Sequence, residues 1–245
     1  MINLTPAFFD RSAPLPLDTS APDDLAGDRH RRLIGYTGLL LPFFIIALVK
    51  KRDGELLWGN LTSISDYYYT GANAAFVGML VALALFLFAY RGFGNRQNWA
   101  DLWVARIAAS AALMVAFFPT KVPLGFTALR WWGDWVGVVH YGAAVVLFSM
   151  FALFALWLFR KKGEGEKAVS DGKKWRNRVY LSCGILIVIS MIWAGWNAFD
   201  GRPIFWPETW ALIFFSISWL VKGYAHAPIV KRVRSLVPQP SARSV

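Results

Sequence analysis

The side chains best suited to chemistry in this sequence are a few carboxylates, one imidazole and their polar or aromatic neighbours. Carboxylates and an imidazole move protons or hold a cation, and a guanidinium pairs with a carboxylate or a phosphate. A hydroxyl group adds a donor, and a tyrosine ring adds an aromatic face for a ligand. The candidate residues are Ser65, Asp66, Tyr68, Arg130, Asp134, His140 and Glu208.

The elements that must position these residues are six apolar stretches, each about as long as one bilayer crossing. A hydrocarbon core of roughly 30 Å needs about 20 mostly apolar residues in an α-helix. The stretches do not alternate apolar and polar residues, so they favour helices over a β-barrel. The sequence therefore predicts an all-α, polytopic transmembrane helical bundle with six spans. The predicted spans are 33–49, 72–90, 102–118, 136–159, 179–196 and 210–221.

The composition agrees with a membrane protein. Hydrophobic residues make up 56% of the chain and charged residues 17%, whereas a water-soluble domain usually carries more charge. Two features inside the spans predict close packing of helices. Ala105, Ala109, Ala112 and Ala116 form a stripe of small residues, and the single cysteine, Cys183, fits a packing position.

Basic residues predict the orientation. Nineteen Lys and Arg lie in the tails and in the loops after the second and fourth spans, against six on the other side, and Arg106 lies within the third span. Loops rich in Lys and Arg stay in the cytoplasm, so both termini are expected there and the candidate residues on the outer side. The expected domains are a disordered polar cytoplasmic tail at 1–32, a transmembrane domain at 33–223 and a basic cytoplasmic tail at 224–245.

The net charge of +11 does not indicate a nucleic-acid partner, because no soluble domain is large enough to present a basic groove. Anionic membrane lipids are the expected partners of these charges. The loop 160–178 holds eight Lys and Arg and is a candidate docking element for a protein partner. The oligomeric state stays open.

One hypothesis is that the ionisable candidates Asp66, His140 and Glu208 converge at the outer mouth of the bundle, because such residues near a span usually face the protein interior. A sequence does not show which helices are neighbours, so their convergence stays open. Each also has a structural alternative. Asp66 suits the cap of the second span, Glu208 suits the first turn of the sixth, and His140 suits a hydrogen-bonded core histidine. Each residue alone favours the structural alternative, whereas their grouping on one side favours function.

Three short motifs resemble a known family. They are Ser-Ile-Ser-Asp-Tyr from Ser63, Phe-Pro-Thr from Phe118 to Thr120, and the lone His140. Over roughly residues 63–159 the chain resembles the uncharacterised prokaryotic membrane proteins grouped as domain of unknown function 998. The resemblance implies a multi-pass protein of a bacterial or archaeal cell membrane, the inner membrane in bacteria, with no established activity or substrate.

A fainter resemblance links Ser65, Asp66 and His140 to the alkaline-ceramidase and adiponectin-receptor-like membrane hydrolases. Those proteins place a Ser, an Asp and three His around a metal. The paired histidines of the family's last spans are absent here, so a three-histidine zinc site cannot be built. The resemblance then leaves only a mixed site for a divalent metal, made by His140, Asp66 and Glu208.

Three functions remain open on the sequence. The first is a membrane protein of undetermined activity whose outer vestibule, lined by the seven candidates, binds a lipid or a small amphipathic ligand. The second is a metal-assisted membrane hydrolase acting on a lipid, in which one carboxylate activates water. The third is a membrane scaffold that binds a partner through residues 160–178. Whether the chain is an enzyme stays open, and no cofactor is predicted outside the second function.

Overall fold

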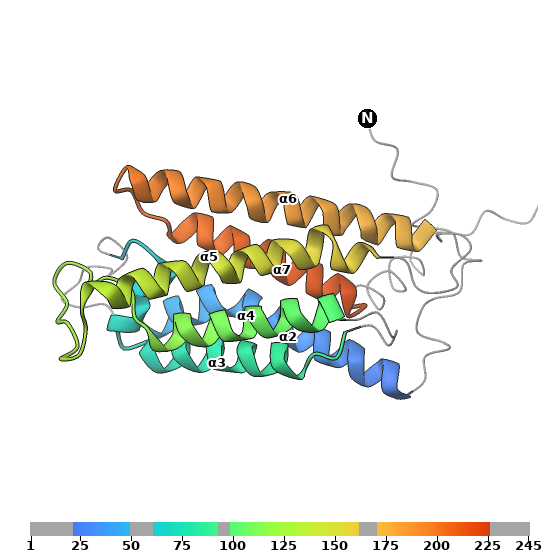
Figure 1. Cartoon of the computed structure of the whole chain (residues 1–245), viewed down its shortest axis with the longest axis horizontal. Helices are drawn as coiled ribbons and strands as arrows, with labels where there is room; N and C mark the ends of the chain where they lie inside the picture. The colour runs from blue at the N-terminus through green and yellow to red at the C-terminus, as the bar shows by residue number, and fades with distance from the viewer. Residues whose placement is uncertain (1–21, 50–60, 93–98, 162–170, 226–245) are drawn as a thin grey trace, which may run out of the picture.

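The computed structural model describes residues 22–49, 61–92, 99–161 and 171–225. All regular structure in these ranges is helical, so the predicted all-α class is confirmed (Figure 1). The long helices are α2 (Pro22–Leu48), α3 (Asn73–Ala89), α4 (Trp99–Phe117), α5 (Asp134–Leu156), α6 (Asp171–Phe199) and α7 (Phe205–Lys222). Two short 3-10 helices are η2 (Ile64–Tyr69) and η3 (Leu158–Arg160).

Within the described residues, four helical segments are long and apolar enough to cross a membrane. They are Ala26–Leu48, Trp99–Phe117, Asp134–Arg160 and Asp171–Phe199. Helix α3 is apolar but shorter. Side chains that point away from the bundle are largely apolar and exposed along these helices, as Leu85, Val145 and Ile192 show. Such a surface suits contact with lipid.

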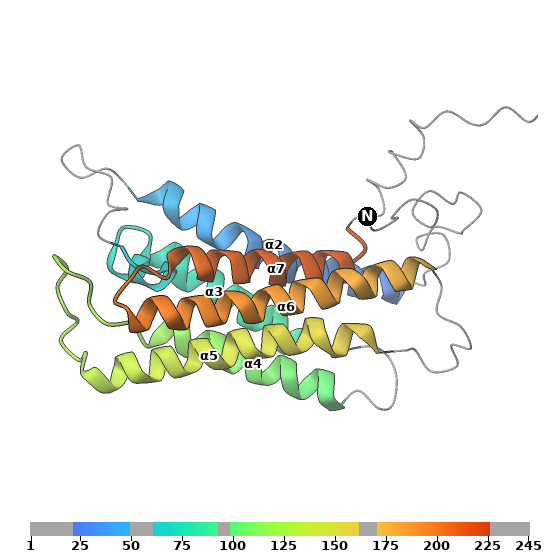
Figure 2. The same cartoon turned by 90° about the horizontal axis from the view of Figure 1, so that it is seen from above.

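The helices form a closed ring in sequence order. Each long helix packs against the next, and α2 closes the ring by packing against α7. They lie side by side along the long axis of the molecule, as both views show (Figures 1 and 2). The connections gather at two ends. The polar end comprises residues 61–72, 118–133 and 200–208, and the opposite end comprises 26–32, 90–92, 157–161 and 222–225.

Five of the six long helices begin earlier than the sequence predicted, α2 and α6 by eight residues or more. Helix α2 begins at Pro22, so residues 22–32, predicted as part of a disordered tail, are helical. Helix α6 begins at Asp171, so the second part of the predicted loop 160–178 is helical too. Hydropathy marks the part of a helix in apolar surroundings, whereas backbone hydrogen bonds continue through polar residues beyond it. The remaining tail residues 1–21 and 226–245, and loop residues 162–170, lie outside the described residues.

Helix α7 is the inner helix of the ring. It packs against α2 and α6, and also contacts α5. The hydroxyl groups of Thr209, Ser216 and Ser218 are buried and donate to carbonyls of α7 itself at 2.6 to 2.8 Å. Trp219 is fully buried among the rings of Tyr90 and Phe154, with centroids 5.0 Å away. Helix α7 has protein on most sides, so these buried hydroxyl groups find their hydrogen-bond acceptors within the helix itself.

Glycines allow α2 and α7 to lie in close contact. A Cβ atom at Gly35 would lie 2.8 Å from Leu220 Cγ, and one at Gly38 would lie 2.8 Å from Ser216 Oγ. Real Cβ contacts are almost never so short, so larger residues would force the helices apart. The predicted alanine stripe of α4 is likewise buried, with its four residues at most 1% exposed.

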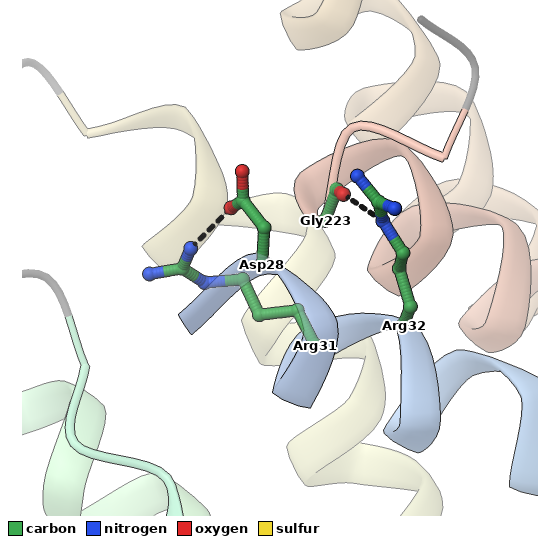
Figure 3. A network of polar contacts seen from close by, with 4 residues as sticks. All are labelled: Asp28, Arg31, Arg32 and Gly223. Carbon is green, nitrogen blue, oxygen red and sulfur yellow. Dashed lines mark hydrogen bonds and ion pairs between the residues drawn. The ribbon is translucent and has the colours of Figure 1, made fainter. Parts of the chain in front are cut away.

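Arg32 of α2 connects the same two helices at the opposite end of the bundle (Figure 3). Arg32 Nε donates to the Gly223 carbonyl at 2.6 Å, which closes the end of α7 against α2. Arg31 pairs with Asp28 at 2.7 Å, and both side chains are largely buried. A Cβ at Gly223 would lie 2.8 Å from the Asp28 carbonyl oxygen, so this junction requires glycine. Helix α2 is therefore anchored on α7 beyond its apolar part.

Candidate functional site

The polar end is built around a capping box at the start of η2. The Ser63 hydroxyl accepts from the Asp66 backbone N–H at 3.2 Å. The Asp66 carboxylate accepts in return from the Ser63 N–H at 3.0 Å and the Ser63 hydroxyl at 3.1 Å. It also accepts from the N–H and the hydroxyl of Thr62. Four donors thus hold a carboxylate that is only 4% exposed, which explains how this acid is buried in an apolar protein.

Glu208 binds this turn to the start of α7. Its Oε2 atom accepts from the Ile64 backbone N–H at 2.7 Å. The Thr62 carbonyl accepts from the N–H groups of Ile204 and Phe205 at 2.6 and 2.9 Å. Glu208 lies in the first turn of α7, as one of the sequence alternatives predicted. Its carboxylate, however, bonds to a segment 144 residues away in the chain, which no local pattern shows.

Thr120 joins η2 to the connection between α4 and α5. Its carbonyl accepts from the Tyr69 hydroxyl at 2.7 Å and from Trp132 Nε1 at 3.2 Å. Its own hydroxyl donates to the Tyr141 hydroxyl at 2.9 Å, and the residue is 1% exposed. Sequence reasoning did not select Thr120 as a site residue. The only signal was its place in the Phe-Pro-Thr motif that ends the third predicted span.

His140 is a core residue of α5 with 1% exposure. Its Nδ1 atom lies 2.6 Å from the Phe118 carbonyl oxygen. A carbonyl can only accept, so Nδ1 carries the hydrogen and donates it. The Asp66 and Glu208 carboxylates both accept from backbone N–H groups of the η2 turn, at Ser63 and Ile64. Tyr69 of η2 donates to Thr120, two residues after the Phe118 that His140 contacts. The three candidates are therefore connected through η2 and residues 118–120 at the polar end.

The other candidates lie around this group. Ser65 is buried in η2, and Tyr68 is half-buried, with its ring 5.5 Å from Tyr69 and 6.4 Å from Phe76 between centroids. Arg130 and Asp134 are exposed at the end of the α4–α5 connection, outside the hydrogen-bond network of the described residues. The structure thus separates a buried group from two exposed charges.

Burial changes the acidity of two tyrosines in η2. It raises the pKa of Tyr67, and the neighbouring Asp66 carboxylate raises it further. Burial also raises the pKa of Tyr69 to about 12, with smaller contributions from Tyr68, Asp66 and Tyr141. Desolvation penalises a phenolate, so both side chains stay neutral near pH 7. Tyr69 consequently remains the donor that its bond to Thr120 requires.

The described residues contain no group of three His, Cys, Asp or Glu side chains that could hold a metal ion. His140, Asp66 and Glu208 therefore do not form the mixed metal site considered above. Asp66 and Glu208 each accept backbone N–H groups, and His140 donates to a backbone carbonyl. These hydrogen bonds join α7, η2, α5 and the end of α4.

Comparisons of the chain with protein-family models, curated proteins and solved structures found no match. The two resemblances noted in the sequence therefore stay predictions.

Proposed function

We propose that this chain is a multi-pass protein of the cell's inner membrane that binds a lipid or a small amphipathic molecule at its polar end. In this proposal α2 to α7 each cross the bilayer. Both termini are cytoplasmic, and the polar end faces outward. Residues 1–21 and 226–245 are the cytoplasmic tails.

Exposed tryptophans at both ends of the bundle support the membrane setting. Trp131, Trp135 and Trp206 are 51 to 58% exposed at the polar end. Trp99 and Trp157 are 71% and 50% exposed at the opposite end. Tryptophan prefers the boundary between lipid and water, so two such groups separated by apolar surface fit the two faces of a bilayer. Helices α3 and α7 are shorter, but each packs beside longer helices. Their lengths are therefore consistent with a position in the same bilayer.

The observation that carries the ligand proposal is the contrast between the buried network and the exposed groups beside it. A fully hydrogen-bonded core around Asp66 and Thr120 makes the end rigid. On its surface Arg130, Trp131 and Asp134 are exposed next to one another in the chain. A molecule with a charged head and an apolar chain matches a guanidinium beside an indole at a membrane face.

Photocrosslinking with a diazirine-bearing lysophosphatidylcholine, on the full-length protein in nanodiscs, tests this proposal. We expect adducts to concentrate in residues 118–133. Replacing the indole contact in Trp131→Ala should lower their yield about two- to tenfold. Arg130→Gln should act in the same direction.

Arg202→Gln is the matched control, since Arg202 is exposed at the same end and pairs with Asp200 at 3.2 Å. Trp99→Ala controls for a general effect of an exposed tryptophan at the opposite end. Adducts spread evenly over the lipid-facing helices, or unchanged in both polar-end variants, would contradict the proposal.

A further inference from the structure

A second feature, separate from the polar end, is a groove between α4 and α5. It has a volume of about 490 Å³ and is open along one side. Helix α4 contributes Trp103, Arg106 and Met114, and helix α5 contributes Val139, Gly142 and Val146. The groove is lined mostly by apolar side chains, and Arg106 is its charged residue.

Arg106 is unusual because it is an exposed cation within an apolar, membrane-length helix. It lies seven residues after Trp99, which places it about 10 Å along the helix. Its guanidinium lies 5.8 Å from the centre of the Trp103 ring and forms no ion pair with any described residue. A charge in such surroundings needs a partner, which lipid tails do not provide.

The direction of the side chain indicates where that partner lies. Long side chains on a helix lean toward its N-terminus, and Arg106 accordingly reaches back over Trp103, three residues earlier. That end of α4 is the opposite end of the bundle, where Lys161 pairs with Asp101 at 3.4 Å. The guanidinium is therefore directed toward the headgroup layer of the membrane leaflet on that side.

The length of the groove fits one acyl chain. Trp103 and Met114 are separated by eleven residues, or about 16 Å along the helix axis. Half of a roughly 30 Å hydrocarbon core is about 15 Å, the depth of one leaflet. An apolar channel of this length, with a cation near its headgroup end, matches a molecule with an acyl chain and an anionic head.

We propose that this groove is a binding site for one glycerophospholipid of the leaflet at the opposite end. One acyl chain lies along α4 and α5, and the phosphate pairs with Arg106. A guanidinium binds phosphate through two parallel hydrogen bonds, which an ammonium cannot reproduce. The site does not involve the polar end, so its test is independent of the ligand proposed there.

Gly142 allows the groove to be filled without disturbing the fold. A Cβ added to Gly142 would meet no atom within 4 Å. A larger side chain at this position therefore enters the groove rather than the helix contacts. Gly78 on α3 is equally open, with nothing within 4 Å of its Cβ position, and provides a matched control away from the groove.

Native mass spectrometry of the full-length protein, with palmitoyl-oleoyl-phosphatidylglycerol added in detergent, measures the site. We expect one lipid bound more tightly than the rest. Arg106→Gln, which removes a charged hydrogen-bond partner, and Gly142→Phe, which fills the groove, should each weaken it about tenfold. Arg106→Lys should recover only part of the affinity.

The controls are Arg178→Gln, which removes an exposed arginine of α6, and Gly78→Phe. Both should bind as the unmodified protein does, and thermal melting shows whether each variant is folded. Palmitoyl-oleoyl-glycerol, which has the chains without the phosphate, should bind at least about tenfold more weakly. Equal binding of this phosphate-free lipid, a loss in only one groove variant, or an equal loss in a control would overturn the proposal.

Discussion

Single residues at the polar end show how an apolar protein keeps acids and an imidazole inside it. Asp66 is buried because four donors from Thr62 and Ser63 surround its carboxylate. Glu208 and His140 each bond to the backbone of another segment. A buried polar group with its hydrogen bonds made costs little, whereas the same group without them costs much more. Residues selected as candidates for chemistry thus also connect the elements.

A substitution at Asp66 should reveal this role. In Asp66→Asn one carboxylate oxygen becomes an amide nitrogen, which faces donors and cannot accept from them. We expect the free energy of unfolding to fall by about 1–3 kcal/mol, the cost of unsatisfied buried donors. Urea or thermal unfolding in detergent measures the change. Asp134→Asn, at an exposed position, should stay within about 0.5 kcal/mol, and an equal effect of both would contradict the assignment.

The elements are held together by close approach as much as by apolar burial. Helices α2 and α7 lie together because Gly35 and Gly38 have no side chains in the way. Helix α4 also lies close to its neighbours, because the alanines of its stripe are small and almost fully buried. In lipid, apolar side chains gain little by leaving the solvent, so tight packing contributes more to helix association.

Filling one of these contacts should separate the helices. Gly38→Leu places atoms where Ser216 and Phe215 already lie, 2.8 to 2.9 Å from the new Cβ. We expect a loss of about 1–3 kcal/mol in the free energy of unfolding. Gly78→Leu, with open space at its Cβ, should be neutral or stabilising, since glycine inside a helix costs about 0.5–1 kcal/mol. Similar losses in the two variants would show that the α2–α7 contact is not the cause.

For the whole molecule, the distribution of charge and tryptophan predicts how the bundle lies in a membrane. Arg29 and Arg178 are exposed toward the opposite end, and the sequence concentrates its basic residues in the segments at that end. Positive segments stay in the cytoplasm. The six-helix ring, with its apolar exterior between two sets of exposed indoles, is therefore expected to place the polar end outside.

Labelling of single cysteines tests this orientation. The only natural cysteine, Cys183, is buried and is removed by Cys183→Ala. In that background a membrane-impermeant maleimide should label Arg130→Cys in intact cells, and Arg178→Cys only after permeabilisation. Both positions are exposed, so access rather than burial decides the result. Labelling in the reverse order would contradict the orientation.

Much of the architecture was predictable because it depends on local composition. An apolar run of membrane length leaves its backbone no partner but itself, so it forms a helix wherever it lies in the chain. A helix is present at every predicted span, four helical segments of the described residues are long and apolar enough to cross a membrane, and the α4 alanines are buried as their spacing indicated. Helix ends were predicted less well. Residues 22–32 and 171–178 are polar yet helical, because their hydrogen bonds do not depend on hydropathy.

The relations between distant segments required the tertiary structure. The sequence by itself determined that Asp66, His140 and Glu208 lie near the ends of apolar runs. Only the folded chain places Glu208 on the Ile64 N–H, joins Tyr69 to Thr120 and leaves Arg106 beside a groove. Local composition determines whether a segment is helical in lipid. Which helices become neighbours depends instead on how well the surface of one helix packs against the surface of another. That packing involves two segments at once, so neither sequence segment shows it alone.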